Sequence, residues 1–321
     1  MKLRFRRWTK NPGIGGVLET PEDFVVREIL HPKLLRKFQQ QKYILLHIRK
    51  RGIPTAEALR RLKPYARGEI GLAGLKDKFS VSYQYFTVKN YTPCHLENPS
   101  VIHVSPCETW LSPGSLLGNE FEILLHGCDT RHMKVIGEVA EGIPNYFGSQ
   151  RFGSKGNNHE IGKMMVKRSY KRALKLINEQ YGKQLTNMRH VPKRRLKFFV
   201  NAYQSWLFNE TLNRYVKHYD KPYFREAKIF GADTRIGKSV PDRILREIVT
   251  KEKIAARDFG FPDLRLSCRG GERSLFVRTS VSCTPTGTTV KLVFSLPKGS
   301  YATVLLNEIC KKPFNSKEHT K

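Results

Sequence analysis

The chain has 321 residues, and its 39% hydrophobic and 11% aromatic content is typical of a globular protein with one or two domains. Its 58 Lys and Arg residues exceed its 28 Asp and Glu residues, which leaves a formal net charge of +30. Such a charge predicts a polyanionic partner, and nucleic acid is the expected one because every phosphate that Lys or Arg neutralises releases counterions. No segment has the roughly 18 consecutive apolar residues of a membrane span, so we expect no membrane partner.

The first residues and the cysteines indicate a protein of the cytoplasm. Residues 1–10 are basic, but no apolar segment follows them, so they do not resemble a secretory signal. The six cysteines are scattered without a Cys-x-x-Cys pair, which predicts reduced thiols and no zinc site. Two close pairs, Cys94 with His95 and His126 with Cys128, are more simply explained as coincidence. We therefore expect a cytoplasmic protein with no metal ion.

The N-terminal part of the chain carries mainly strand patterns. Runs of apolar and β-branched residues predict strands over residues 21–30, 42–50, 82–89, 100–105 and 119–127. The last run alternates Phe121, Ile123 and Leu125 with polar residues, as a half-buried strand does. Helices are predicted over residues 55–62, and over residues 128–142 with Asp129 or Thr130 as the N-cap.

A loop rich in Gly and Asn, residues 143–158, precedes a helical and strongly basic segment. The longest predicted helix covers residues 198–216, where an apolar stripe is interpreted as core rather than as a binding face; it consists of Phe199, Tyr203, Trp206 and Leu207. Strand patterns return over residues 273–282 and 288–297. The order of strands, helices and strands predicts an α+β fold in which residues 1–143 and 273–321 share one domain and residues 144–272 form a helical insertion.

One carboxylate stands out in the stretch GLAGLKDKFSVSYQYF, residues 71–86. Asp77 lies between Lys76 and Lys78, directly before alternating aromatic residues. The local sequence is typical of a turn, in which Asp is common. It is also compatible with a reactive carboxylate that is kept ionised by positive charge and faces an unpaired nucleobase.

Six stretches in the same order as in a known family bear on this choice. They are GIGG with PEDFVVREIL, AGLKDKFSVSYQYF, GSLLGNEFEILLHG, IPNYFGSQRFG, AYQSWLFN and FSLPKGSYATVLLNE. Through them the chain resembles the TruD family of tRNA pseudouridine synthases over residues 13–308. The resemblance implies an α+β fold: a pseudouridine-synthase-like catalytic domain with a mixed or antiparallel sheet, and an inserted, mainly helical TRUD domain.

The resemblance also implies an activity, the isomerisation of a uridine to pseudouridine, typically at position 13 of tRNA. Asp77 occupies the position of the family's nucleophile. A carboxylate can attack C1′ of the ribose or C6 of the uracil, or assist elimination to a glycal, and the sequence does not choose among these routes. The reaction has no net redox change, so we expect no cofactor.

By motif position, Phe24, Asn119, Phe121 and Tyr301 are the predicted substrate contacts. The Asn119 amide offers both a donor and an acceptor, and Tyr301 could stack on the flipped base. Each residue also has a purely structural explanation: sheet core for the two phenylalanines, a turn for Asn119, and packing under a Gly-Ser bend for Tyr301.

Two features depart from the family pattern. Members often carry a basic residue just before the PEDF element, where this chain has Leu18 and Glu19, so another cation is expected beside Asp77. Lys76 is the first choice, and Lys78 and Arg151 are alternatives; Arg151 could instead face phosphate. The segment between QRFG and FSLP is also compact for the family, which predicts reduced RNA recognition there.

Other functions remain open on the sequence. A non-catalytic RNA-binding or RNA-folding protein on the same scaffold would share the charge, and the altered residues near Glu19 keep it in view. A metalloenzyme is disfavoured by the spacing of Cys and His. No interface pattern is visible, so we expect a monomer.

Overall fold

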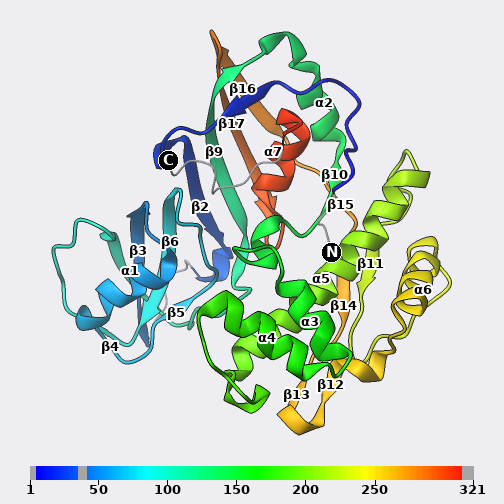
Figure 1. The fold of residues 1–321 in the computed structure, drawn as a ribbon. Helices are drawn as coiled ribbons and strands as arrows, with labels where there is room; N and C mark the ends of the chain where they lie inside the picture. Colours follow the sequence, from blue (N-terminus) through cyan, green and yellow to red (C-terminus); the bar gives the residue numbers. More distant parts are fainter. Residues whose placement is uncertain (1–4, 35–41, 313–321) are drawn as a thin grey trace. The chain divides into compact units, whose positions relative to one another are not determined.

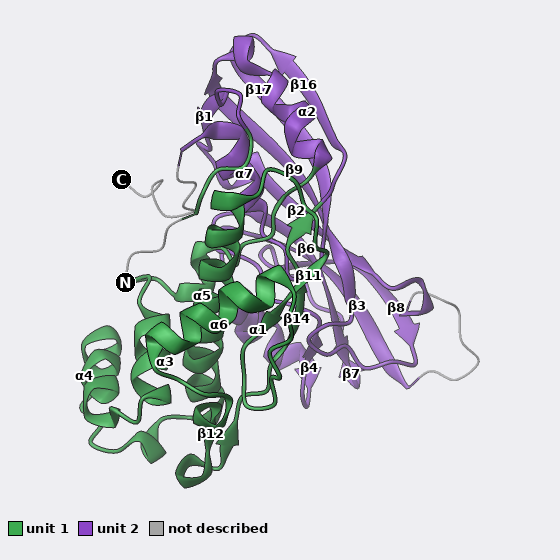
Figure 2. Ribbon diagram, turned by 90° about the vertical axis from the view of Figure 1, so that its right-hand side faces the viewer, with its two compact units in different colours: residues 1–9, 142–277 green, residues 10–141, 278–321 purple. Residues whose placement is uncertain are grey.

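The protein is described by a computed structural model that covers residues 5–34 and 42–312 (Figure 1). Contacts divide the chain into two compact units, coloured separately in Figure 2. Unit 1 comprises Met1–Thr9 and Gly142–Val277, and unit 2 comprises Lys10–Glu141 and Arg278–Lys321. The start of the chain was expected in the sheet domain, but residues 5–9 belong to unit 1, where the Trp8 and Phe276 rings lie 4.7 Å apart.

The core of unit 2 is one large sheet with the strand order β16-β17-β9-β2-β6-β3-β8. All neighbours on this path are antiparallel except β2 and β6, which run parallel. The short strands β1 and β5 add to β9 and β6. The bounds are β1 Gly15–Val17, β2 Phe24–Leu30, β3 Tyr43–Arg51, β5 Gly71–Leu72, β6 Val81–Val88, β8 Ser100–Cys107, β9 Leu116–Cys128, β16 Val281–Thr286 and β17 Thr289–Pro297.

Strand β9 contributes one buried row of side chains to the sheet. The predicted alternation is confirmed, because Phe121, Ile123 and Leu125 are all buried. Their partners in β17 are Phe294, Leu292 and Val290, which are buried as well. Side chains alternate between the two faces of a strand, so this register aligns two apolar rows on one face of the sheet.

Within its described residues, three helices cover parts of unit 2. Helix α1 (Thr55–Leu62) places Leu62 in a cluster with β3 and β6 residues, and α2 (Lys134–Glu141) and α7 (Ala302–Cys310) contact each other beside β16 and β1 (Figure 1). The helix predicted over residues 128–142 begins later than expected. Asp129 accepts a hydrogen bond from the Arg131 backbone N–H and caps a 3₁₀ turn before α2, not α2 itself. The remaining pair of strands, β4 (Ala66–Arg67) and β7 (Asn90–Tyr91), forms a separate ribbon.

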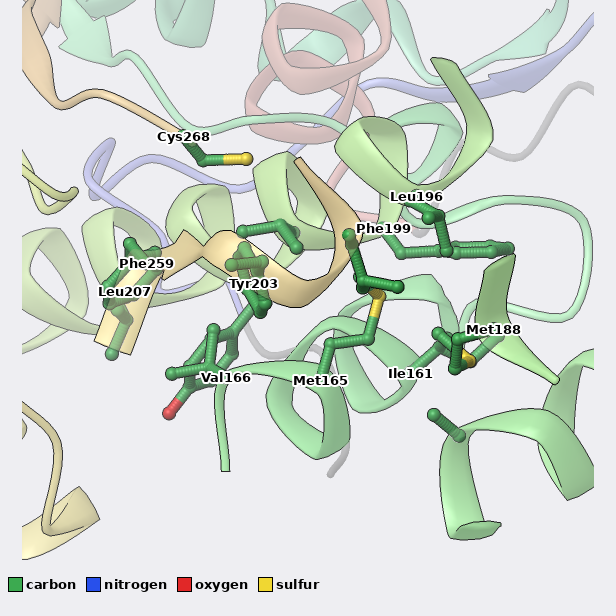
Figure 3. Packing of buried hydrophobic residues seen from close by; sticks show 14 of the residues in the cluster. Ile161, Met165, Val166, Met188, Leu196, Phe199, Tyr203, Leu207, Phe259 and Cys268 are labelled. Atoms are coloured by element: carbon green, nitrogen blue, oxygen red, sulfur yellow. The ribbon is translucent and has the colours of Figure 1, made fainter. Parts of the chain in front are cut away.

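Unit 1 is mainly helical, with α3 (Asn158–Val166), α4 (Tyr170–Tyr181), α5 (Lys193–His218) and α6 (Val240–Glu252). The apolar stripe of α5 is core as predicted for Phe199, Tyr203 and Leu207. Figure 3 shows Phe199 beside Met165 of α3, and Leu207 beside Phe259. Helices α3 and α5 approach closely at Gly162, where a Cβ atom would lie 2.1 Å from the Phe199 carbonyl oxygen. Only glycine permits that approach.

The strand predicted over residues 273–282 is wrong as a single element. Its residues are divided among β14 (Gly271–Ser274), β15 (Phe276–Val277) and β16, which pair with β11 (Glu226–Ile229), β10 (Ile143–Pro144) and β17. The chain leaves unit 1 and enters unit 2 within this stretch. A continuous β pattern therefore serves three different sheets, which local periodicity cannot reveal. A further short ribbon in unit 1 joins β12 (Gly260–Phe261) and β13 (Leu266–Ser267).

Candidate active site

The loop between β5 and β6 carries the AGLKDK motif, and neighbouring elements hold its backbone. Thr55, the first residue of α1, accepts a hydrogen bond from the Lys76 N–H at 2.9 Å. Its Oγ1 also lies 3.1 Å from Oε1 of Gln84, whose amide donates to the Gly74 carbonyl oxygen at 3.2 Å. Thr55 and Gln84 are buried, so these bonds are shielded from water.

Asp77 is half-buried, and its backbone carbonyl oxygen is hydrogen-bonded to two side chains. That oxygen accepts hydrogen bonds from Lys50 Nζ at 2.6 Å and from Ser80 Oγ at 3.1 Å. Lys50 Nζ also donates to the Ile53 carbonyl oxygen at 2.8 Å. The Ser80 hydroxyl is shared with Ser82 on β6 at 2.8 Å. Strands β3 and β6 therefore determine where residue 77 lies.

Lys50 is the unexpected member of this cluster, because its side chain is 0% exposed. Burial lowers the pKa of Lys50 to about 8, although the negative charge of Asp77 raises it; the positive charge of Lys76 lowers it further. A buried cation is tolerated only with partners. The two carbonyl oxygens and the nearby carboxylate supply them.

The Lys76 side chain points to a different carboxylate. Its Nζ lies 2.8 Å from Glu28 Oε1 and donates to Asn119 Oδ1 at 2.7 Å. The second oxygen of Glu28 accepts from the Tyr85 backbone N–H at 2.9 Å. Glu28 and Asn119 are register partners on β2 and β9, so both side chains lie on the same face of the sheet. Three residues far apart in the chain thus form one polar cluster around the buried Glu28.

Phe24 and Phe121 lie side by side in the sheet core. Their ring centroids are 6.0 Å apart in an edge-to-face arrangement, and Phe121 stacks on Phe294 with centroids 5.3 Å apart. All three are buried. These contacts support a packing role for both phenylalanines, whereas their predicted contact with substrate stays a prediction.

Tyr301 follows the end of β17 and precedes α7. The register places Pro297 of β17 opposite Gly118, next to Asn119 in β9, and the Lys298 N–H continues the pairing by donating to the Leu117 carbonyl oxygen at 2.9 Å. The half-buried Tyr301 is the N-cap residue of α7, and its carbonyl oxygen accepts from the Val304 N–H at 3.0 Å. The turn that carries Tyr301 therefore begins at the Asn119 end of β9.

Arg151 belongs to unit 1. Its Nε donates to Ser205 Oγ at 3.0 Å, and its guanidinium lies 5.7 Å from the Phe147 ring centroid. The loop around it is held by α5, because the Asn209 side chain pairs with both the N–H and the carbonyl oxygen of Phe147 at 2.9 Å. Ser205 and Asn209 of the AYQSWLFN segment therefore hold this loop in place. The predicted relation of Arg151 to Asp77 stays a prediction.

Leu18 and Glu19, which stand where family members often carry a basic residue, lie just before the 3₁₀ turn that leads into β2. Leu18 is buried in the core, and Glu19 is exposed with its backbone N–H donated to Asp23 Oδ2 at 2.7 Å. The Thr20 N–H donates to the same oxygen at 2.7 Å. Asp23 of the PEDF element therefore organises the entry to β2.

Lys50, Glu28, Thr55 and Gln84 were not predicted as site residues. A signal was present for the first two, because Lys50 continues the buried positions Leu46 and Ile48 of β3, and Glu28 continues Val26 of β2. A charged residue in phase with a buried row must find a partner. Which partner it finds depends on strand order, which the local pattern does not contain.

Among the residues that the structure describes, no group of three or more His, Cys, Asp or Glu side chains is arranged to hold a metal ion. All six cysteines are free thiols. Tyr91 Oη lies 3.4 Å from Cys94 Sγ, and the Cys128 thiol lies 3.6 Å from the Leu125 carbonyl oxygen. None of the helices in residues 5–34 and 42–312 is both long enough and apolar enough to cross a membrane.

Comparisons with known proteins agree with one another. The family model for tRNA pseudouridine synthase D (TruD) matches residues 5–187 and 217–309. A relative named "Probable tRNA pseudouridine synthase D" from Thermococcus onnurineus is 27% identical over 418 aligned positions, covering 96% of this chain and 98% of the relative. The "tRNA pseudouridine synthase D" of Syntrophotalea carbinolica is 25% identical and covers 94% and 98%.

A solved structure shows the same fold. The crystal structure of the "Putative tRNA pseudouridine synthase D (TruD)" from Methanosarcina mazei superposes with a TM-score of 0.70 at 21% identity, covering 96% of both chains. The alignment with the Thermococcus relative is longer than this chain, so that relative contains segments that are absent here.

Proposed function

The chain belongs to the TruD family and is a tRNA pseudouridine synthase, and from this premise we propose that it isomerises the uridine at position 13 of tRNA with Asp77 as the nucleophile. In this isomerisation the N1–C1′ bond of the uridine breaks and a C5–C1′ bond forms after the uracil has turned. C5 loses its proton to solvent, and N1 gains one. The atoms of the nucleoside are conserved, so the chemistry needs no oxidant or reductant.

The observation that carries the proposal is the support of the loop around Asp77. The backbone of Gly74, Lys76 and Asp77 is held by side chains from α1, β3 and β6. An ordinary surface turn does not need buried partners from three elements. A nucleophile does need them, because a misplacement of about 1 Å can reduce a rate on the order of a hundredfold.

Each of the three chemical routes requires an ionised carboxylate. Attack on C1′ or on C6 uses the carboxylate as a nucleophile, and the glycal route uses it as a base or as a countercharge. The buried cation Lys50 donates to the Asp77 carbonyl oxygen, and its charge interacts with that of the Asp77 carboxylate. The arrangement therefore supports an ionised Asp77 in all three routes and leaves the choice between them to kinetics.

Asn119 and Tyr301 are the substrate contacts that we favour. The Asn119 Oδ1 atom is occupied by Lys76, so its amide nitrogen is the group proposed to donate to a uracil carbonyl oxygen. Tyr301 would stack on the extruded base, because the turn that carries it starts beside the strand of Asn119. Phe24 and Phe121 would shape the apolar surface beneath that base.

We assign the chemistry to unit 2, which contains Asp77, and phosphate contacts to unit 1. Exposed basic residues of α4 and of the first turns of α5 carry that assignment: Lys171, Arg172, Lys175, Lys193, Arg194 and Lys197. Phosphate contacts position an RNA without reading its bases. A monomer acting on tRNA in the cytoplasm is part of the same proposal.

The proposal is tested with tRNA transcripts labelled with tritium at uridine C5. Formation of the C5–C1′ bond expels that tritium into water, so release measures the reaction directly. We expect release by the wild-type protein and none by Asp77→Asn, which keeps the size of the side chain. Asp129→Asn, at a half-buried carboxylate of the same unit that pairs with Arg131, is the matched control and should keep full activity.

The alternative function is a non-catalytic RNA-binding or RNA-folding protein. It predicts no tritium release by any variant, together with tight binding of several tRNAs by both the wild type and Asp77→Asn. That result would make Asp77 a turn residue and would overturn the enzyme proposal for this chain.

A further inference from the structure

Lys50 is a fully buried lysine at the centre of the loop support. It lies on β3 in phase with Leu46 and Ile48, and its register partner in β6 is Ser82. Its ammonium group donates to the carbonyl oxygens of Ile53 and Asp77 at 2.8 and 2.6 Å. An apolar side chain at this position would avoid the cost of burying a charge. The fold alone therefore does not explain why a lysine is there.

Two lysines and two carboxylates near the loop form two pairs of opposite charge, Lys76 with Glu28 and Lys50 with Asp77. Lys76 is neutralised by Glu28, whose oxygen is 2.8 Å away and whose side chain is fully buried. Asp77 and Lys76 are the charged groups whose fields act on Lys50, the first favouring its protonated form and the second opposing it. Once Lys76 is paired with Glu28, Asp77 is the carboxylate that balances the charge of Lys50.

We propose that Lys50 is a positioning residue of the reaction, which holds the Asp77 carbonyl through a hydrogen bond and keeps a positive charge close to the Asp77 carboxylate. This inference rests on the proposed function of Asp77. It also accounts for the missing basic residue at Leu18 and Glu19. In this proposal the positive charge near Asp77 comes from Lys50 of β3 and not from the segment before PEDF.

A positioning role of the Lys50 charge makes the reaction rate depend on pH, which a purely structural role would not. Burial brings the pKa of Lys50 to about 8, so its charge is lost just above neutral pH. The neutral amine still has two N–H donors, enough for the carbonyl oxygens of Ile53 and Asp77. Raising the pH therefore removes the charge and leaves both hydrogen bonds in place.

The experiment measures single-turnover tritium release from pH 6.5 to 9.5 with enzyme in excess over tRNA. We expect the wild-type rate to fall as pH rises through about 8, with little change in the enzyme concentration that gives half the maximal rate. Lys50→Met should reduce the rate on the order of a hundredfold and remove the inflection. Lys50→Arg, which stays charged, should keep its rate to higher pH.

Ser80→Ala is the matched control, since it removes a neutral hydrogen bond to the same carbonyl oxygen. It should slow the reaction modestly and keep the wild-type inflection. The inference is overturned if Lys50→Met retains the wild-type rate, or if its lower rate still shows the inflection near pH 8. Should Lys50→Met not fold, a flat wild-type profile from pH 7 to 9.5 would overturn it equally. No release by the wild type at any pH would instead reject the proposed function.

Discussion

Lys76 Nζ and Glu28 Oε1 lie 2.8 Å apart in a buried ion pair, with side-chain exposures of 7% and 0%. The pair joins the AGLKDK motif to β2, and Asn119 joins the same ammonium to β9. Removing one partner of such a pair leaves a buried charge without compensation, which costs more than the pair contributes. The pair therefore links stability of the sheet to the geometry of the loop.

For Glu28→Gln we expect the free energy of unfolding to fall by about 3–5 kcal/mol, because Lys76 stays buried without its counter-charge. The midpoint of urea unfolding measures the change. The control is Glu272→Gln in the exposed pair with Lys228, which should leave the midpoint unchanged. An unchanged midpoint for Glu28→Gln would show that the pair does not hold the loop.

Phe121 tests whether the aromatic cluster is packing or a base contact. Phe121→Ala should destabilise the protein by about 3–5 kcal/mol, since the buried ring contacts Phe24 and Phe294. Phe121→Leu should retain most of the stability and the activity. A leucine variant that melts like the wild type but releases no tritium would instead establish a substrate contact.

Gly118 is predicted to tolerate no side chain. A Cβ atom there would lie 2.3 Å from the Leu296 carbonyl oxygen, so Gly118→Ala must displace β9 from β17. Gly137→Ala in α2 is the matched control, because nothing lies within 4 Å of its Cβ position. We expect a lower melting temperature for the first, and for the second a gain of up to about 1 kcal/mol from helix propensity. Equal effects of the two substitutions would contradict the close strand approach.

Leu75 is 68% exposed although it precedes Lys76 and Asp77, whose positions are held by buried partners. We expect Leu75→Ala to weaken tRNA binding about tenfold by filter binding, because contact with RNA would bury this side chain. The loss should not change the salt dependence, since no phosphate contact is removed. Val17→Ala, at a side chain on β1 that is 43% exposed, is the control and should bind like the wild type. Equal affinities would remove Leu75 from the RNA surface.

The burial of Lys50 also predicts a pH dependence of stability. Its pKa falls from 10.5 to about 8 on folding, so between these values the unfolded chain binds a proton that the folded protein lacks. Stability contributed by this group therefore rises with pH across that window, by about 3 kcal/mol in total, and is constant below it. The difference in unfolding free energy between wild type and Lys50→Met should show this rise. A difference independent of pH from 7 to 10.5 would mean that folding leaves the pKa of Lys50 unchanged, so that Lys50 stays charged when buried.

Local patterns predicted those parts of the protein in which neighbours along the chain decide the structure. Helix α1 has the predicted bounds, and the alternation of Phe121, Ile123 and Leu125 identified the buried face of β9. The motif around Asp77 was also identified, because its residues are consecutive. Residues 273–282 were misread because the chain changes from one unit to the other inside an unbroken β pattern.

The sequence by itself determined the family, the α+β class, the basic charge and the residue types at positions 76, 77, 119 and 301. Only the tertiary structure decided which charges are paired: Lys76 with Glu28, and Lys50 beneath Asp77. The physical reason is that electrostatic and hydrogen-bond energies depend on distance and burial, and both arise from the order of β2, β6 and β3 in the sheet. A linear sequence shows that Lys50 and Glu28 fall on buried rows, but not what lies across from them.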